Sequence, residues 1–113
     1  MSDKTSEFYA KFKNDVEKMK AMCPDTINGF MGMFGKIMGE SALSIKQKEL
    51  IALAIGVSSS CTPCIRLHVQ KCIAAGATRE EMVEAASVAV MMAGGPAFTH
   101  LPVVIDAIEV LGA

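Results

Sequence analysis

Residues 44–76 read SIKQKELIALAIGVSSSCTPCIRLHVQKCIAAG, and this stretch decides the fold. Ser44 and the glutamine three residues after it match a capping box placed just before an apolar run, which predicts a helix over about residues 45–57. The three serines at 58–60 predict a turn, and a second helix follows and stops at Gly76, a natural helix terminator. We therefore expect a helical hairpin.

The segments on either side also have the apolar periodicity of helices, and none has the alternation of a strand. Further helices are predicted at about 5–21, 27–38, 78–92 and 98–111. Glycines spaced three or four residues apart in segment 27–38 suggest close approach of another helix. From Ala85 onward the fifth helix is apolar on nearly every side, so we expect it to be central. The predicted fold class is an all-α bundle of about six helices.

Composition limits the function. The chain has 113 residues and is 51% hydrophobic, which predicts one domain over residues 1–113. A formal net charge of -1 with scattered Lys and Arg gives no reason to expect nucleic-acid binding. The apolar runs are shorter than the roughly 20 residues of a membrane span, and the polar N-terminal segment resembles neither a signal nor a transit peptide. We expect a soluble, cytoplasmic protein.

The string Cys61-Thr62-Pro63-Cys64-Ile65-Arg66-Leu67-His68 carries the predicted chemistry. The positive end of a helix favours thiolate over thiol, and a proline is suited to the first helical turn. His68 follows Cys64 by one turn and is placed to take its proton. Cys61 is then placed to resolve a mixed disulfide formed at Cys64. The string predicts a thiol redox site with its own base.

Glu49 is tied to this site by the hairpin. It lies about ten residues before the turn, and His68 lies about nine residues after it, so the two should sit at matching heights. One interpretation is that its carboxylate orients His68 and completes a Glu-His-Cys chain. The other is that Glu49 is solvated at the edge of the apolar face. Spacing alone leaves both open.

Three other residues have chemistry of their own. Cys72 lies roughly 12 Å along the helix from Cys64, too far to pair with it in an intact helix. For Cys72 and Cys23 we expect small, buried apolar side chains. His100 follows a Gly-Gly-Pro turn, where a structural role is the commoner one, and a position near the site or an interface is the alternative.

The combination of Glu49 with the Cys61-x-x-Cys64-x-x-x-His68 string closely resembles the AhpD-like branch of the carboxymuconolactone decarboxylase family. The resemblance covers about residues 27–111 and leaves 1–26 as an N-terminal helical extension. It implies an all-α domain that assembles into trimers or hexamers and catalyses thiol-disulfide exchange linked to peroxide reduction. It also implies that the glutamate and histidine relay protons to the cysteine pair, with Cys64 as the usual nucleophile.

The predicted thiol mechanism needs no cofactor beyond the Cys61-Cys64 disulfide. The expected substrate is a small peroxide or disulfide, and the expected reductant is a dithiol such as a lipoyl or thioredoxin-type protein, with a peroxiredoxin as a further partner. Well-studied AhpD proteins have a second histidine where this chain has Pro63, so dithiol-disulfide exchange is a safer expectation than peroxidase turnover. The decarboxylases that give the family its name lack the cysteine pair, and the match does not extend to their chemistry.

Two alternatives compete with the redox hypothesis. Thiolates with imidazole suit zinc, but a closed site wants four protein ligands, so Glu49 or a neighbouring subunit would have to complete it. A non-catalytic interaction domain would explain the nine methionines, which provide adaptable apolar surface, but it leaves the Cys-x-x-Cys-x-x-x-His string to chance.

Overall fold

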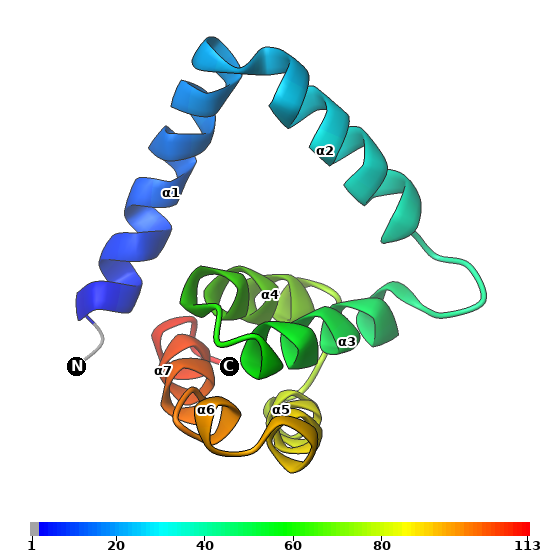
Figure 1. Cartoon of the computed structure of the whole chain (residues 1–113), viewed down its shortest axis with the longest axis vertical. Helices are drawn as coiled ribbons and strands as arrows, with labels where there is room; N and C mark the ends of the chain where they lie inside the picture. Colours follow the sequence, from blue (N-terminus) through cyan, green and yellow to red (C-terminus); the bar gives the residue numbers. More distant parts are fainter. Residues whose placement is uncertain (1–2) are drawn as a thin grey trace.

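The computed structural model describes residues 3–113 and is all-α (Figure 1). The described residues form seven helices and no strand: α1 (Asp3–Met22), α2 (Pro24–Ile37), α3 (Ile45–Ser58), α4 (Thr62–Ala74), α5 (Arg79–Ala93), α6 (Gly95–Phe98) and α7 (Leu101–Val110). The predicted fold class is confirmed. The six predicted helices are all present, and α6 is an additional single turn inside the segment predicted as a loop.

Helix α2 begins earlier than predicted, at Pro24, because proline is suited to the first helical turn. Residues 1–2 of the predicted N-terminal extension lie outside the described part of the chain.

The hairpin of α3 and α4 forms as predicted, and the two helices pack against each other. The backbone N–H of Gln47 donates to Ser44 Oγ at 3.0 Å, and the backbone N–H of Ser44 donates to the Gln47 side chain at 2.8 Å. This reciprocal capping box fixes the start of α3. Cys61 is the residue that caps α4, so Cys61 precedes the helix and Cys64 lies in its first turn.

The core lies between α3, α4, α5 and α7, with α3 packed against both α4 and α5 (Figure 1). Its largest members are branched or long apolar side chains supplied by all four helices: Leu53, Val57, Ile65, Val69, Met82, Val104 and Ile108. Alanines on α5 and α7 complete it, since small side chains let helices approach closely. The core therefore fixes α3 and α4, the two helices that carry the predicted site.

The prediction that the end of α5 is central is wrong. Val88, Met91 and Met92 are exposed, the last two by more than 80%. Helix α5 packs on the bundle through Met82, Ala86 and Ala89, and its exposed apolar side chains lie on other faces of the helix. A helix that is apolar all round is buried only if a neighbour covers each side.

Helices α1 and α2 meet at a corner away from the bundle, and together they form an arm (Figure 1). Helix α1 reaches the bundle near its start, where the Thr5 hydroxyl donates to Asp106 and the Tyr9 hydroxyl donates to the backbone carbonyl of Arg66. Helix α2 has no buried residue. Cys23 stands at the corner and is exposed, so the prediction of a buried Cys23 is wrong, because the arm leaves the core before that residue.

The predicted close approach at the glycines of α2 is also wrong within residues 3–113. A Cβ added at Gly29, Gly32 or Gly35 would meet nothing within 4 Å. The close approach occurs instead on α3, where a Cβ at Gly56 would lie 3.3 Å from the Cβ of Cys64. Gly56 therefore lets α3 lie directly against the first turn of α4.

Candidate redox site

The two cysteines of the predicted site form a disulfide. The Sγ atoms of Cys61 and Cys64 are 2.05 Å apart, and their Cα atoms are 5.2 Å apart. The sulfur of Cys61 also accepts a hydrogen bond from the backbone N–H of Cys64 at 3.2 Å. Cys61 therefore caps α4 through its sulfur, in the position where serine or aspartate is commonly found.

Glu49 and His68 are joined across the hairpin. His68 Nδ1 lies 2.7 Å from Glu49 Oε1. The Glu49 side chain is 5% exposed and that of His68 is 19% exposed, so the contact is largely shielded from water. This burial excludes the interpretation of Glu49 as a solvated residue at the edge of the apolar face. The other interpretation, a carboxylate in contact with His68, agrees with the structure.

The hydrogen bond fixes which nitrogen of His68 is free. An ionised carboxylate only accepts hydrogen bonds, so Nδ1–H donates to Glu49 and Nε2 keeps the lone pair of the neutral ring. Positions 64 and 68 are one turn apart on α4, so His68 lies on the same helical face as Cys64. The arrangement places an imidazole, hydrogen-bonded to a carboxylate, one turn along α4 from Cys64 of the disulfide.

Three residues outside the predicted set also contact this site. Phe34 of α2 stacks on His68, with ring centroids 6.3 Å apart and planes inclined by 23°. The ammonium of Lys71 lies 5.0 Å from the centroid of the Phe34 ring. Gly56 abuts Cys64. A lone glycine inside an apolar helix signals close packing, so Gly56 was detectable in the sequence, whereas nothing local marks Phe34 or Lys71.

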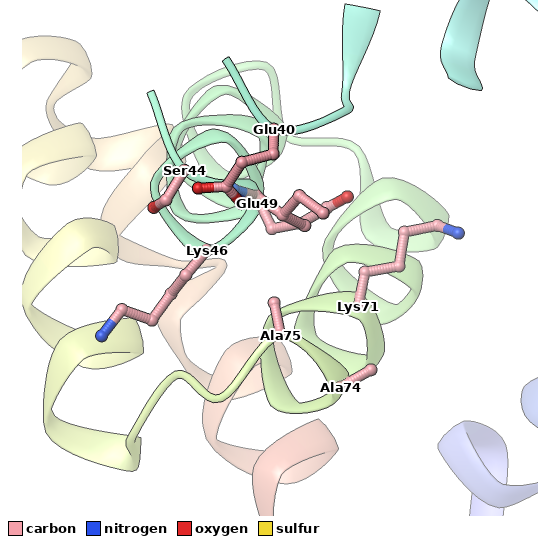
Figure 2. Close-up of a pocket in the computed structure, with 8 residues that line it drawn as sticks. Glu40, Ser44, Lys46, Glu49, Lys71, Ala74 and Ala75 are labelled. Atoms are coloured by element: carbon pink, nitrogen blue, oxygen red, sulfur yellow. The ribbon is translucent and has the colours of Figure 1, made fainter. Parts of the chain in front are cut away.

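A groove of about 450 Å³ lies beside Glu49 (Figure 2). Figure 2 shows Glu49 on one side of it and Lys71, Ala74 and Ala75 of α4 on the other. Lys46, at its edge, donates to Glu81 of α5 at 3.0 Å. Glu49, although buried, is one of the residues that line this groove.

Cys72 and His100 lie apart from this chemistry. Cys72 is a free, fully buried thiol, as predicted, and is not part of the disulfide. Burial raises its pKa to about 12, and the nearby charge of Glu49 adds to the rise. His100 Nδ1–H donates to the carbonyl of Pro96 at 2.7 Å, within its own turn, so the structural interpretation of this residue holds.

Metal binding finds no support in the part of the chain that the structure describes. Residues 3–113 contain no group of three or more His, Cys, Asp or Glu side chains placed to hold a metal ion. Both thiols that would serve as ligands are engaged in the disulfide. Within the same range, no helix is long and apolar enough to cross a membrane.

The fold and site thus define an all-α domain with a cysteine pair and a paired glutamate and histidine on one hairpin. The chain belongs to the carboxymuconolactone decarboxylase family, whose model matches residues 24–102.

Relatives of known sequence include an uncharacterized protein of Cupriavidus necator, 32% identical over 73 residues. A second is uncharacterized protein 4 in the cox locus of Paracoccus denitrificans, 34% identical over 73 residues. Each match covers 65% of this chain, and the matches span 65% and 66% of those relatives' own lengths.

Solved structures extend the comparison to nearly the whole chain. A carboxymuconolactone decarboxylase family protein from Legionella pneumophila matches with a TM-score of 0.91 and 32% identity, over 98% of this chain and 99% of that one. A family protein from Thermotoga maritima with a suggested part in an antioxidative response matches with a TM-score of 0.82 and 27% identity, over 94% and 90%. The Legionella match is long enough to include the arm of α1 and α2.

Proposed function

We propose that this protein is a thiol-disulfide oxidoreductase of the AhpD-like branch of its family. The observation that supports this most directly is the hydrogen bond between His68 and Glu49 on the hairpin that holds the Cys61–Cys64 disulfide. A buried carboxylate, an imidazole with one free nitrogen and two thiols are the groups that such exchange needs.

The first step starts from the reduced protein. His68 Nε2 takes the proton of Cys64, and the thiolate attacks one sulfur of a substrate disulfide. The substrate S–S bond breaks, a mixed disulfide forms on Cys64, and the first substrate thiolate leaves with the proton from His68. Glu49 stabilises the transient imidazolium through its hydrogen bond to Nδ1.

The second step closes the protein disulfide. The Cys61 thiolate attacks the sulfur of Cys64, the mixed disulfide breaks, and the second substrate thiolate leaves and takes up the proton that Cys61 has released. Two electrons have then passed from the cysteine pair to the substrate. The N–H of Cys64 that bonds to the Cys61 sulfur, together with the positive end of α4, favours Cys61 as a thiolate.

An external dithiol completes the cycle by reducing the Cys61–Cys64 disulfide. It attacks Cys64 and expels Cys61, the sulfur that the helix start stabilises best. A lipoyl or thioredoxin-type protein provides the necessary pair of thiols, and no prosthetic group takes part. We place this exchange in the cytoplasm, where such reductants keep dithiols reduced.

A small peroxide is the second oxidant that this site suits. Cys64 thiolate would attack the O–O bond, releasing an alcohol and leaving a sulfenic acid, which Cys61 converts to the disulfide with release of water. The suggested antioxidative part of the Thermotoga maritima relative supports this extension. Pro63 occupies the position of the second histidine of AhpD proteins, so we propose disulfide exchange as the main activity and peroxide reduction as the secondary one. A peroxiredoxin is a further proposed partner.

Assembly into a trimer or hexamer is part of the proposal. Large apolar side chains are exposed along α2 and at the end of α5. They include Phe30, Met33 and Ile37 on α2 and Met91 and Met92 on α5. Monomeric proteins rarely expose contiguous apolar surface of that kind. Contacts between copies would cover it.

The experiment that tests the function assays the reduced protein separately with a disulfide and with a peroxide, while mass spectrometry follows the Cys61–Cys64 pair. We expect fast oxidation by the disulfide, and a Cys64→Ser variant without exchange activity. Full dithiol-disulfide activity in Cys64→Ser would overturn the assignment. Oxidation by peroxide alone would make the protein a peroxidase.

A further inference from the structure

Phe34 is the point at which α2 contacts the redox site. Along the rest of α2 the side chains are exposed or half-buried, and none is buried. Phe34 stacks on the His68 ring at a centroid distance of 6.3 Å, within the range of attractive aromatic pairs. The Lys71 ammonium lies 5.0 Å from the centre of the same ring, close enough for a cation–π attraction. Because Lys71 is one turn after His68, Phe34 spans two neighbouring side chains of α4.

Lys48 fastens the end of α2 to α3. Its ammonium donates to the backbone carbonyls of Ile37 and Gly39, each at 2.7 Å, and to Ser41 Oγ at 3.0 Å. These contacts use all three donors of the ammonium, and a cation at the C-terminal end of a helix is favoured by the helix dipole. Lys48 immediately precedes Glu49, so one short segment of α3 both fastens α2 and orients His68.

The consequence concerns the orientation of the imidazole. The Nδ1–H···Glu49 hydrogen bond fixes one edge of the ring, and rotation about that bond would turn the free nitrogen out of place. The Phe34 ring stacked on the imidazole restricts that rotation, so the Nδ1–H···Glu49 hydrogen bond should open less often.

We infer that Phe34 is a positioning residue of the redox site, held over His68 by the attachment of α2 to Lys48. The kinetic test of this inference rests on the proposed function, but the restraint of the His68 ring can be measured without any enzymatic activity. In this arrangement the arm is part of the site, although it contributes no residue that touches the sulfurs.

The direct test is the exchange of the His68 Nδ1–H proton with water, followed by NMR in protein labelled with nitrogen-15. The signal is assigned by its loss in His68→Gln and its retention in His100→Gln. We expect slow exchange in the native protein and exchange faster by about tenfold or more in Phe34→Leu, with recovery in Phe34→Tyr. Phe30→Leu is the matched control, because it removes the neighbouring ring of α2, 6.2 Å from Phe34, and leaves the one on His68.

Native exchange in Phe34→Leu, or an unprotected His68 signal in the native protein, would overturn the inference. Circular dichroism and thermal unfolding of each variant verify that it remains folded.

The kinetic test compares kcat and KM for a small disulfide with a dithiol reductant between pH 5 and 9. We expect Phe34→Leu to lower kcat about fivefold and to change the kcat–pH profile, with KM within twofold of the native value. Lys48→Met should show the same fall in kcat as Phe34→Leu, whereas Lys48→Arg should keep the native kcat. Native kinetics in Phe34→Leu would contradict the inference, and native kinetics in Lys48→Met would contradict the role of the attachment.

The two proposals can fail separately. A native protein without exchange activity ends the proposed function, while the NMR measurement still decides whether Phe34 holds His68.

Discussion

Glu49 on α3 and His68 on α4 are joined by a hydrogen bond of 2.7 Å between Oε1 and Nδ1. The bond crosses the hairpin near the middle of α4, and both side chains are largely shielded from solvent. A histidine held this way keeps one defined tautomer, with Nε2 free to accept a proton. This relationship connects the packing of the bundle to the chemistry of the cysteine pair.

Replacing Glu49 by Gln tests the carboxylate without changing its shape. The amide oxygen still accepts the His68 N–H, but it offers no charge to the imidazolium, so we expect the exchange rate to fall by about 10²-fold or more. Stability should fall by only about 1 kcal/mol, because the hydrogen bond is retained in neutral form. Stopped-flow oxidation and urea unfolding measure the two effects. A Glu49→Gln protein as fast as the native one would show that the charge plays no part.

The order of the two thiols is tested by Cys61→Ser. Without the thiol of Cys61, no neighbouring thiol can resolve the mixed disulfide on Cys64. The adduct should therefore persist and be detected by mass spectrometry. Turnover should fall by at least about 10²-fold, while the first attack stays fast. A stable adduct on Cys61 in the Cys64→Ser protein, and none on Cys64 in the Cys61→Ser protein, would reverse the assigned roles.

Gly56 leaves little room for a side chain. A Cβ there would already lie 3.3 Å from the Cβ of Cys64, so Gly56→Val must displace the first turn of α4. Overpacking of this kind costs about 1–3 kcal/mol, and the displaced cysteine should also slow exchange. Gly29→Val is the matched control, because a side chain at that position meets open space, and its effect should stay within about 0.5 kcal/mol. Equal losses in the two variants, measured by denaturant unfolding, would refute the packing argument.

Cys72 should be unreactive as long as the protein is folded. Burial raises the pKa of its thiol from the ordinary 9.0 to about 12, so the thiol stays protonated at pH 8, and it is also inaccessible. Iodoacetamide should therefore label one site in the folded, oxidised protein, the exposed Cys23, and a second only in urea. The raised pKa means that the folded state is favoured below pH 9 and loses that advantage as the pH rises from 9 towards 12. Labelling of Cys72 as fast as Cys23 would show that the buried site opens readily.

The exposed end of α5 predicts contacts between copies of the chain. Light scattering should give the mass of a trimer or hexamer at micromolar concentration. Met91→Glu with Met92→Glu places two charges on that face and should shift the mass toward the monomer, since desolvating unpaired charges in an interface is costly. Lys18→Glu changes the charge of an exposed residue of α1 and should leave the assembly intact. A native monomer would contradict the prediction.

Much of the bundle follows from local sequence. Both hydrogen bonds of a capping box are present at Ser44 and at Thr78. The two helices that follow, α3 and α5, start where the sequence predicts. These signals can be detected because capping and apolar periodicity act over three or four residues. Errors appear where burial depends on distant neighbours: Cys23 lies on an arm away from the core, and Met91 and Met92 are exposed at the end of α5.

The candidate site divides in the same way. The amino-acid sequence by itself determined the cysteine pair, the histidine one turn later and the hairpin that brings Glu49 to the same height, because helical rise converts spacing into position. Only the tertiary structure decided that Glu49 is buried against His68, that Gly56 lies against Cys64, and that Phe34 stacks on the imidazole with Lys71 against the Phe34 ring. Those contacts depend on how α2, α3 and α4 pack, and packing between helices is set by side chains far apart in the sequence.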